Sequence, residues 1–248
     1  MSSQRSTSTS TLRSWKGYAL AAAGLLVVAV VVGVGVTAQQ SGNAAPGASG
    51  DPNENPADTS EGSELDMSRR IDGDPLALGA VDAPVVLIEY ADFRCPFCGV
   101  YARDTLPQLI EEYVDAGVVR MEWRDLPVFG DESVAAAVAA RAAGEQGLFW
   151  DFSEVIFANA PERGHVALPR ERLIEIAEQI GVPDMAAFEA DLTDPELLTR
   201  VEADLAEARS LGATGTPTFL VNDTPLSGAQ PISAFRDAIE AELEQARN

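Results

Sequence analysis

The two cysteines of this chain constrain its fold more than any other feature. They lie in the segment Phe93-Arg94-Cys95-Pro96-Phe97-Cys98, shortly after an apolar run rich in β-branched residues, Val85-Val86-Leu87-Ile88. That run is short enough to be a buried strand, and residues 96–116 are typical of a helix. The cysteine pair is therefore expected where a strand of an α/β domain passes into a helix.

The start of a helix favours reactive thiol chemistry. Its unpaired backbone N–H groups and the positive end of its dipole favour a thiolate at Cys95, and the thiolate is the species that exchanges with disulfides. Pro96 suits the first helical position, where its missing N–H removes no hydrogen bond. Cys98 comes back beside Cys95, close enough to form a disulfide. We expect Cys95, at the exposed end, to exchange with substrate and Cys98 to resolve the mixed disulfide.

Two other interpretations of the cysteine pair stay open. A structural zinc site needs four ligands, whereas the chain offers two cysteines and a single histidine, His165. A purely structural disulfide would close a very small loop and add little stability. Redox chemistry explains the spacing better than either, so no metal is expected. His165 lies in a polar loop and is predicted to be a surface residue.

The N-terminal part of the chain does not resemble a globular domain. Residues 1–16 form a Ser/Thr-rich head with three basic side chains, and residues 17–38 carry no charge. A run of this length can cross a bilayer as a helix. The basic head predicts that the N-terminus is cytoplasmic and that the rest lies outside, where disulfides persist. Val36-Thr37-Ala38 resembles a cleavage site, so a removed signal is the alternative to a single-pass membrane anchor.

Composition separates a tether from the predicted domain. Residues 39–67 consist mainly of small, polar and acidic residues and predict a flexible, disordered linker, which leaves residues 68–248 as the globular part. The formal net charge is -22. So acidic a chain is not expected to bind nucleic acid or anionic lipid headgroups.

Glu89 is unusual within the predicted strand, because it places a carboxylate in a run that should be buried, six residues before Cys95. One interpretation is an outward-facing strand residue. The other is a buried carboxyl beneath the cysteine pair, with a raised pKa, that shuttles the proton of Cys98.

The remaining pattern alternates between strands and helices. Short strands are predicted at 76–78 and 118–123, a helical block at about 131–211, and a strand at 219–221 that turns tightly at Asn222-Asp223. A final helix opens at Ser233. Pro217 stands immediately before a predicted strand, which indicates a constrained bond for which the cis isomer is one option.

Taken with this order of predicted strands and helices, the motifs Cys95-Pro96-Phe97-Cys98 and Thr216-Pro217 resemble those of the DsbA-like thioredoxin-fold family of thiol–disulfide oxidoreductases. The resemblance covers about residues 76–246. It implies an α/β thioredoxin fold with an inserted helical block, preceded here by the transmembrane helix and the linker. It further implies that Pro217 is cis and faces the disulfide, that the backbone at Thr216 pairs with substrate, and that Glu89 is the family's buried acid. No cofactor is implied.

The family resemblance also implies a function and partners. The expected activity is the introduction of disulfides into exported proteins that are still reduced or unfolded, followed by re-oxidation through a membrane quinone-linked partner of the DsbB or VKOR type. Phe93, Phe97 and Leu126 are expected to give an apolar surface for unfolded chains, with Pro96 beside them. Phe97 stands where the strongest oxidants of the family have histidine. A reductase or isomerase with the same site, and a non-catalytic binding module, are the alternatives.

Overall fold

The computed structural model describes residues 66–247. The predicted head, the apolar run at 17–38 and all but the end of the predicted linker lie outside the described residues, so they stay predictions. Within 66–247, no helix combines the length and the apolar character needed to cross a membrane.

The sheet contains five strands: β1 (Ala77–Leu78), β2 (Val85–Ala91), β3 (Val119–Asp125), β4 (Thr218–Val221) and β5 (Thr224–Ser227). Their order in the sheet is β1-β3-β2-β4-β5. The central strand β2 runs parallel to β3 and antiparallel to β4. Every residue of β2 and β3 is buried, as expected for strands that are covered on both faces.

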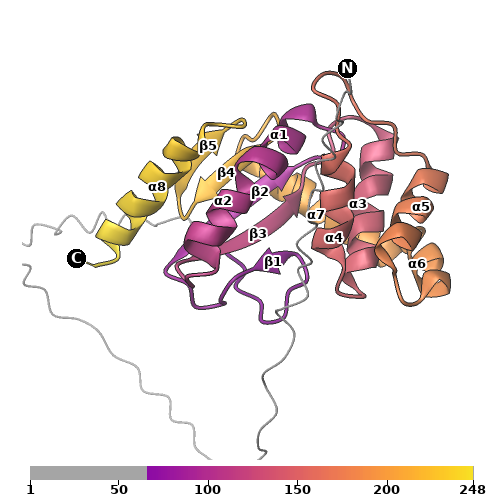
Figure 1. Cartoon of the computed structure of the whole chain (residues 1–248), viewed down its shortest axis with the longest axis horizontal. Helices are drawn as coiled ribbons and strands as arrows, with labels where there is room; N and C mark the ends of the chain where they lie inside the picture. Colours follow the sequence, from indigo (N-terminus) through magenta and orange to yellow (C-terminus); the bar gives the residue numbers. More distant parts are fainter. Residues whose placement is uncertain (1–65, 248) are drawn as a thin grey trace, which may run out of the picture. The chain divides into compact units, whose positions relative to one another are not determined.

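Helices cover both faces of this sheet and extend beyond its edge (Figure 1). Alternate residues of β2 face opposite layers, because side chains along a strand point to opposite sides. Val85 and Leu87 pack under α1 (Pro96–Asp104), α2 (Leu106–Leu109) and α8 (Ile232–Gln245). Val86, Ile88 and Tyr90 pack toward α7 (Pro195–Ser210).

The predicted helical block follows β3. It comprises α3 (Asp131–Gly144), α4 (Phe149–Ala158), α5 (Arg170–Ile180) and α6 (Met185–Asp191), and α7 completes it. These bounds agree with the predicted insertion at about 131–211. The block packs on the edge of the sheet next to α1, so its loops reach the end of β2 where the cysteines lie (Figure 1).

The prediction of one continuous helix over residues 96–116 is wrong. The chain forms α1, then α2, then a π-helical turn at η1 (Ile110–Val114). Thr105 separates α1 from α2. Pro107 has no N–H to donate to the carbonyl four residues earlier, which explains the break at this point.

A group of charged side chains, most of them buried, lies between β3, α3 and α7, and we call it the β3–α7 ion cluster. Its members are Arg69, Arg120, Glu122, Arg124, Asp125, Arg141, Asp204 and Glu207. Glu122 is central, because its carboxylate accepts hydrogen bonds from the guanidinium groups of Arg120 at 2.8 Å and Arg124 at 2.7 Å. It also accepts from the backbone N–H groups of Arg69 and Arg70, so it holds the start of the described chain against the sheet.

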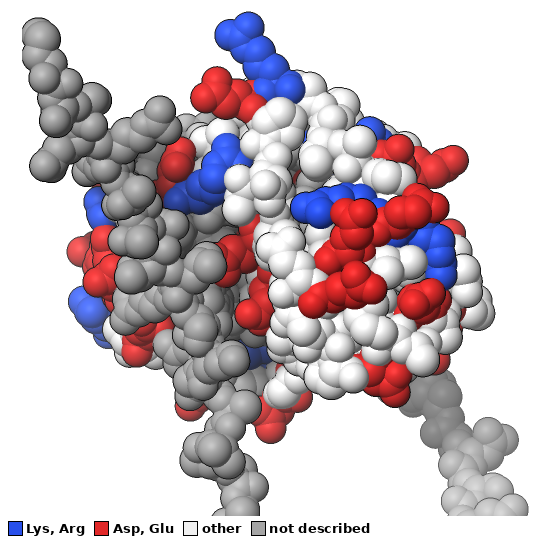
Figure 2. Space-filling view, turned by 45° about the vertical axis from the view of Figure 1, so that its right-hand side comes forward, with Lys and Arg blue, Asp and Glu red and all other residues white. Residues whose placement is uncertain are grey.

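The ion cluster contains equal numbers of arginines and carboxylates, so it is electrically balanced. The net negative charge of the chain is therefore carried by other residues. Figure 2 shows acidic side chains spread over the face that it draws, with arginines between them.

Candidate active site

The two cysteines lie at the carboxyl end of the central strand. Cys95 is the N-cap residue of α1 and Pro96 occupies the first turn, as predicted. Cys98 is fully buried, and both cysteines are free thiols. The expectation that Cys95 is exposed is wrong: only 1% of the residue is accessible. The loop before β4 lies against it, with the Cys95 thiol donating a hydrogen bond to the carbonyl of Thr216 at 3.3 Å.

The surroundings of Cys95 favour its thiolate. The pKa of Cys95 is lowered from 9.0 to about 6, and a hydrogen bond from the Cys98 thiol is the largest contribution, against the opposing effect of burial. The backbone N–H groups of Phe97 and Cys98 at the start of α1 act in the same direction. The Thr216 hydroxyl, which is buried and has no other hydrogen-bond partner within residues 66–247, also lowers this pKa.

We expect Cys95 to titrate with a midpoint near pH 6, three units below an ordinary thiol of pKa 9.0. The rate of alkylation by iodoacetamide, measured from pH 4 to 10 with mass-spectrometric assignment, reports the thiolate directly. Cys98→Ala removes the main hydrogen-bond donor, so it should move the midpoint upward. A midpoint near 9 in the unmodified protein would contradict the assignment.

Cys98 has the opposite electrostatic character. Burial raises its pKa well above 9.0, and the neighbouring Cys95 and Glu89 raise it further. A thiol in this position stays protonated at neutral pH unless a nearby base accepts its proton. The two sulfurs of one motif therefore differ sharply in reactivity.

Glu89 lies on the face of β2 that carries α1. It is 3% exposed, so the outward-facing interpretation is wrong and the buried placement is confirmed. Burial, and then the charge of Cys95, raises the pKa of Glu89 from 4.5 to about 8. A carboxyl with this pKa can hold or release a proton near neutral pH. Its catalytic role stays a prediction.

The loop before β4 completes the site. The Thr216–Pro217 peptide bond is cis, which was one of the options for this bond. Phe219, two residues after the proline, pairs directly with Glu89 across β4 and β2. The antiparallel pairing of these two strands therefore brings residues about 120 positions apart in the sequence to the same end of the sheet.

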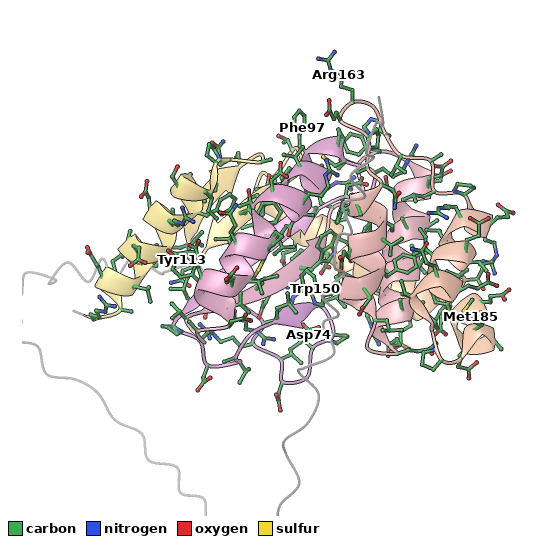
Figure 3. All side chains as sticks on the ribbon, in the orientation of Figure 1. Asp74, Phe97, Tyr113, Trp150, Arg163 and Met185 are labelled. Carbon is green, nitrogen blue, oxygen red and sulfur yellow. The ribbon has the colours of Figure 1, made fainter. Side chains whose placement is uncertain are left out.

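The predicted apolar surface is smaller than expected. Phe97 is 60% exposed and projects from the start of α1 (Figure 3). Phe93 and Leu126 are each 1% exposed, so their assignment to a contact surface is wrong. Phe93 instead stacks on Trp123 with ring centroids 4.9 Å apart, in the core between the sheet and the helical block.

Asp92 shapes the site and was not singled out from the sequence, whereas Arg94 was considered only as a charge near Cys95. Asp92 is buried, and its carboxylate accepts hydrogen bonds from the N–H groups of Arg94 at 2.8 Å and Val128 at 2.7 Å, which fixes the turn before Cys95. The Arg94 side chain binds the carbonyls of Phe129 and Val166, so it anchors two loops of the helical block. An Asp-x-Arg segment before the cysteines was the only available signal.

His165 is exposed, as predicted, yet it lies near the cysteines. Its Nδ1 is 3.1 Å from the carbonyl oxygen of Arg94, the residue before Cys95. Its ring packs on Phe129 with centroids 4.0 Å apart. The sequence contained no signal for this contact, because the two segments are about 70 residues apart.

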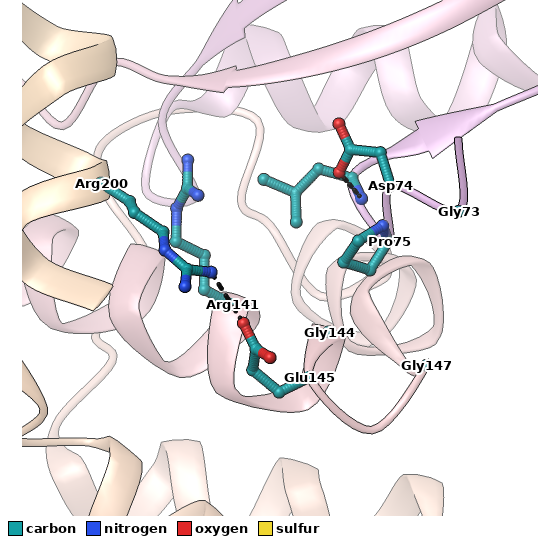
Figure 4. A pocket seen from close by; sticks show the side chains of 9 residues that line it. Gly73, Asp74, Pro75, Arg141, Gly144, Glu145, Gly147 and Arg200 are labelled. Atoms are coloured by element: carbon teal, nitrogen blue, oxygen red, sulfur yellow. Dashed lines mark hydrogen bonds and ion pairs between the residues drawn. The ribbon is translucent and has the colours of Figure 1, made fainter. Parts of the chain in front are cut away.

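A separate hollow of about 480 Å³ opens between the start of the described chain, α3 and α7 (Figure 4). Asp74, Arg141, Glu145 and Arg200 are among its lining residues. Arg141 and Arg200 are already paired with carboxylates. None of the site residues predicted from the sequence lines this hollow, so it is not part of the thiol site.

Comparisons with known proteins agree with this geometry. The family model described as thioredoxin matches residues 72–241. The probable disulfide bond formation protein D of Bacillus anthracis is 32% identical over 173 residues, covering 68% of this chain and 78% of that protein. The Na⁺/H⁺ antiporter NhaA 3 of Salinispora tropica is 36% identical over 171 residues, but this chain spans only 25% of its length.

Solved structures show the same fold. BdbD from Bacillus subtilis, in its oxidised form, superposes with a TM-score of 0.64 at 27% identity, covering 69% of this chain and 94% of that one. The alpha-DsbA1 protein of Wolbachia pipientis has a TM-score of 0.61 at 24% identity, and it supports the fold alone.

The fold and the paired thiols define a DsbA-like thiol–disulfide oxidoreductase. The chain belongs to the thioredoxin family, and the resemblance that its motifs predicted is confirmed.

Proposed function

We propose that this protein introduces disulfides into exported proteins through its Cys95–Cys98 pair. The observation that carries the proposal is the opposite shift of the two thiols: the pKa of Cys95 is lowered to about 6, while that of Cys98 is raised well above 9.0. Stabilising one thiolate stabilises the reduced form, which makes the corresponding disulfide a better oxidant. The name of the Bacillus anthracis relative, probable disulfide bond formation protein D, also favours the oxidation of substrate thiols over the reduction of disulfides.

The reaction begins with the disulfide form of the enzyme. A substrate thiolate attacks the sulfur of Cys95, the Cys95–Cys98 bond breaks, and Cys98 leaves as a thiolate. A second substrate thiolate then attacks the substrate sulfur of the mixed disulfide, and Cys95 leaves. The substrate loses two electrons and forms one disulfide, while the enzyme gains two electrons and becomes a dithiol. The low pKa of Cys95 makes it the better leaving group in this second step.

Glu89 supplies the proton that Cys98 needs on leaving. With a pKa near 8, the carboxyl is mostly protonated at neutral pH, and it is buried close enough to Cys98 to affect the pKa of that thiol. Transfer of its proton avoids leaving an unpaired thiolate in a fully buried position. In the reverse direction, the Glu89 carboxylate accepts the proton of Cys98 and activates that thiol.

Substrate contacts are expected around the exposed rim of the site. Phe97 is the large apolar side chain that projects beside the cysteines, and Pro96 adjoins it. We propose that the backbone at Thr216 and the cis Pro217 pairs with an extended substrate chain. Such backbone pairing suits unfolded substrates, because it reads no particular side chain.

The proposed compartment and re-oxidation follow from the N-terminal sequence and from the family resemblance. An anchor at residues 17–38 would hold the domain outside the membrane, with the N-terminus cytoplasmic. A membrane partner of the DsbB or VKOR type, linked to quinone, would then take two electrons and two protons from the enzyme dithiol.

Cys98→Ser tests this function, because it removes the resolving thiol and should trap mixed disulfides between Cys95 and exported proteins. Non-reducing electrophoresis of extracts from cells that express the full chain would show these adducts, and a reductant should cleave them. The matched variant Cys95→Ser keeps one thiol but should give none. A lane free of adducts in Cys98→Ser would favour a non-catalytic binding module.

A reductase or isomerase is a second candidate because of Phe97, which adds no positive charge beside the Cys95 thiolate. The reduction potential of the Cys95–Cys98 pair separates disulfide formation from disulfide reduction. Equilibration with glutathione should place it in the range of disulfide-forming enzymes, about -120 to -180 mV. A value near that of thioredoxin, about -270 mV, would instead assign a reductase.

A further inference from the structure

Two polar groups of interest lie in the mainly apolar layer between the sheet and helices α1, α2 and α8. One is the Glu89 carboxyl, and the other is the hydroxyl of Tyr101. Tyr101 is 0% exposed, and its hydroxyl has no hydrogen-bond partner among the residues that the structure describes. Within residues 66–247, the Glu89 carboxyl also forms no side-chain hydrogen bond. Buried hydroxyls are nearly always paired, so an orphan hydroxyl within electrostatic reach of a proton-carrying acid requires an explanation.

The fold brings these two groups to the same place. Tyr101 follows Cys98 by three residues on α1, so both side chains lie on one face of the helix, over the sheet. The Tyr101 ring packs on Phe219 with centroids 4.6 Å apart, and Phe219 is the residue paired with Glu89 on the neighbouring strand. Glu89 and Tyr101 interact electrostatically, and a charge on Glu89 disfavours ionisation of the phenol.

We propose that Tyr101 is a positioning residue for the proton relay, and that its hydroxyl donates a hydrogen bond to the Glu89 carboxylate once Glu89 has passed its proton to Cys98. This inference rests on the proposed function and names a further participant in it. Cys98 gains the proton and becomes a neutral thiol, and Glu89 becomes an anion in a dry layer. The Tyr101 hydroxyl keeps its own proton and stabilises that anion until solvent returns a proton to Glu89.

The orphan state of the hydroxyl fits this role. In the free-thiol structure the phenol hydroxyl lies beyond hydrogen-bond distance of the Glu89 oxygens. A neutral carboxyl is a weak acceptor and an ionised carboxylate a strong one, so ionisation of Glu89 favours the hydrogen bond. The other titratable groups that face Glu89 are Cys95 and Cys98 from α1. Its strand neighbours Phe219 on β4 and Trp123 on β3 carry no charge. The Trp123 indole N–H already donates to Asp125. Among these neighbours, Tyr101 therefore carries the free donor that takes no part in thiol exchange.

The test replaces the hydroxyl and keeps the ring. In Tyr101→Phe, the apparent pKa of Glu89 should be about one unit higher than in the unmodified protein, because the carboxylate loses its donor. The readout is the release of glutathione from a Cys95–glutathione mixed disulfide, in which Cys98 attacks and Glu89 accepts its proton. Stopped-flow rates from pH 5 to 10 should show the shifted profile, with about tenfold slower release at pH 7.

Two further variants make the result specific. In a Glu89→Gln background, adding Tyr101→Phe should leave the pH profile unchanged, because there is no carboxylate to stabilise. Tyr113→Phe is the matched control, because the Tyr113 hydroxyl donates to Glu240 in an exposed position. Its loss should leave the pKa of Glu89 and the rate of glutathione release unchanged. Titration of the Glu89 carboxyl by carbon-13 NMR measures the same shift directly and does not depend on turnover.

An unshifted Glu89 titration in Tyr101→Phe would overturn the proposal. An equal change of rate in the Glu89→Gln background would also overturn it, because Tyr101 would then act independently of the carboxyl. Neither result would affect the proposed function, whose test is adduct trapping by Cys98→Ser. Trapping should persist when Tyr101→Phe is combined with Cys98→Ser, because attack through Cys95 does not use Glu89.

Discussion

Replacing Glu89 by Gln should stabilise the folded protein by about 3 kcal/mol at pH 7 while slowing thiol exchange. In the folded state the pKa of Glu89 is raised to about 8, whereas an unfolded chain ionises it near 4.5. Folding at pH 7 therefore requires the uptake of a proton, and each unit of difference corresponds to about 1.4 kcal/mol. The figure is an upper value, because the buried amide of Gln also lacks partners.

The pH dependence of this effect has a definite sign. Below pH 4.5 the carboxyl is protonated in both states, so Glu89→Gln should change the free energy of unfolding little. Between pH 4.5 and 8 the unfolded state loses its proton while the folded state keeps it, so the unmodified protein loses stability relative to the variant. Urea unfolding of both proteins at pH 4, 6 and 8 measures the difference. A variant that is less stable at pH 8 would contradict the raised pKa.

Glu122→Gln should lower the free energy of unfolding by about 3–5 kcal/mol at pH 7, the usual effect of removing one partner from a buried ion pair. The guanidinium groups of Arg120 and Arg124 would lose their shared carboxylate in a position where water does not replace it. The amide of Gln would also accept fewer of the hydrogen bonds that now reach Glu122 from Arg69 and Arg70.

Low pH should lower the free energy of unfolding of the unmodified protein through the same Glu122 carboxylate. Burial opposes ionisation of Glu122, but its hydrogen bonds outweigh burial and lower its pKa from 4.5 to about 2. The stability that comes from this carboxylate is therefore fully present above pH 4.5 and is lost as the pH falls toward 2. The matched control is Glu112→Gln, which breaks an ion pair with Arg236 on the surface and should change stability far less. Equal destabilisation by both variants would show that burial of the ion cluster does not matter.

The functional reasons for these two carboxylates differ. Glu122 is ionised and surrounded by arginines, and it holds the start of the described chain to β3. Glu89 is placed in an apolar layer at a cost to stability, which is the pattern expected for a group that must exchange a proton. Strand β2 and strand β3 lie side by side, yet alternation of side chains sends the two acids into opposite layers.

The sequence by itself determined the local features of this protein. A short β-branched run followed by Cys95-Pro96-Phe97-Cys98 predicts a strand, a helix N-terminus and a reactive thiol, because each depends on neighbouring residues. The helical block is also predictable from the spacing of apolar residues. These signals were sufficient to identify the thioredoxin fold and the cysteine pair.

Only the tertiary structure decided which distant residues surround the thiols. Phe93 and Leu126 are buried, His165 contacts Arg94, and Tyr101 lies in the layer of Glu89. Pairing of β2 with β4 and packing of the helical block on α1 create these contacts between residues far apart in the sequence. Burial and pKa depend on the sum of such contacts, and local pattern carries no information about that sum.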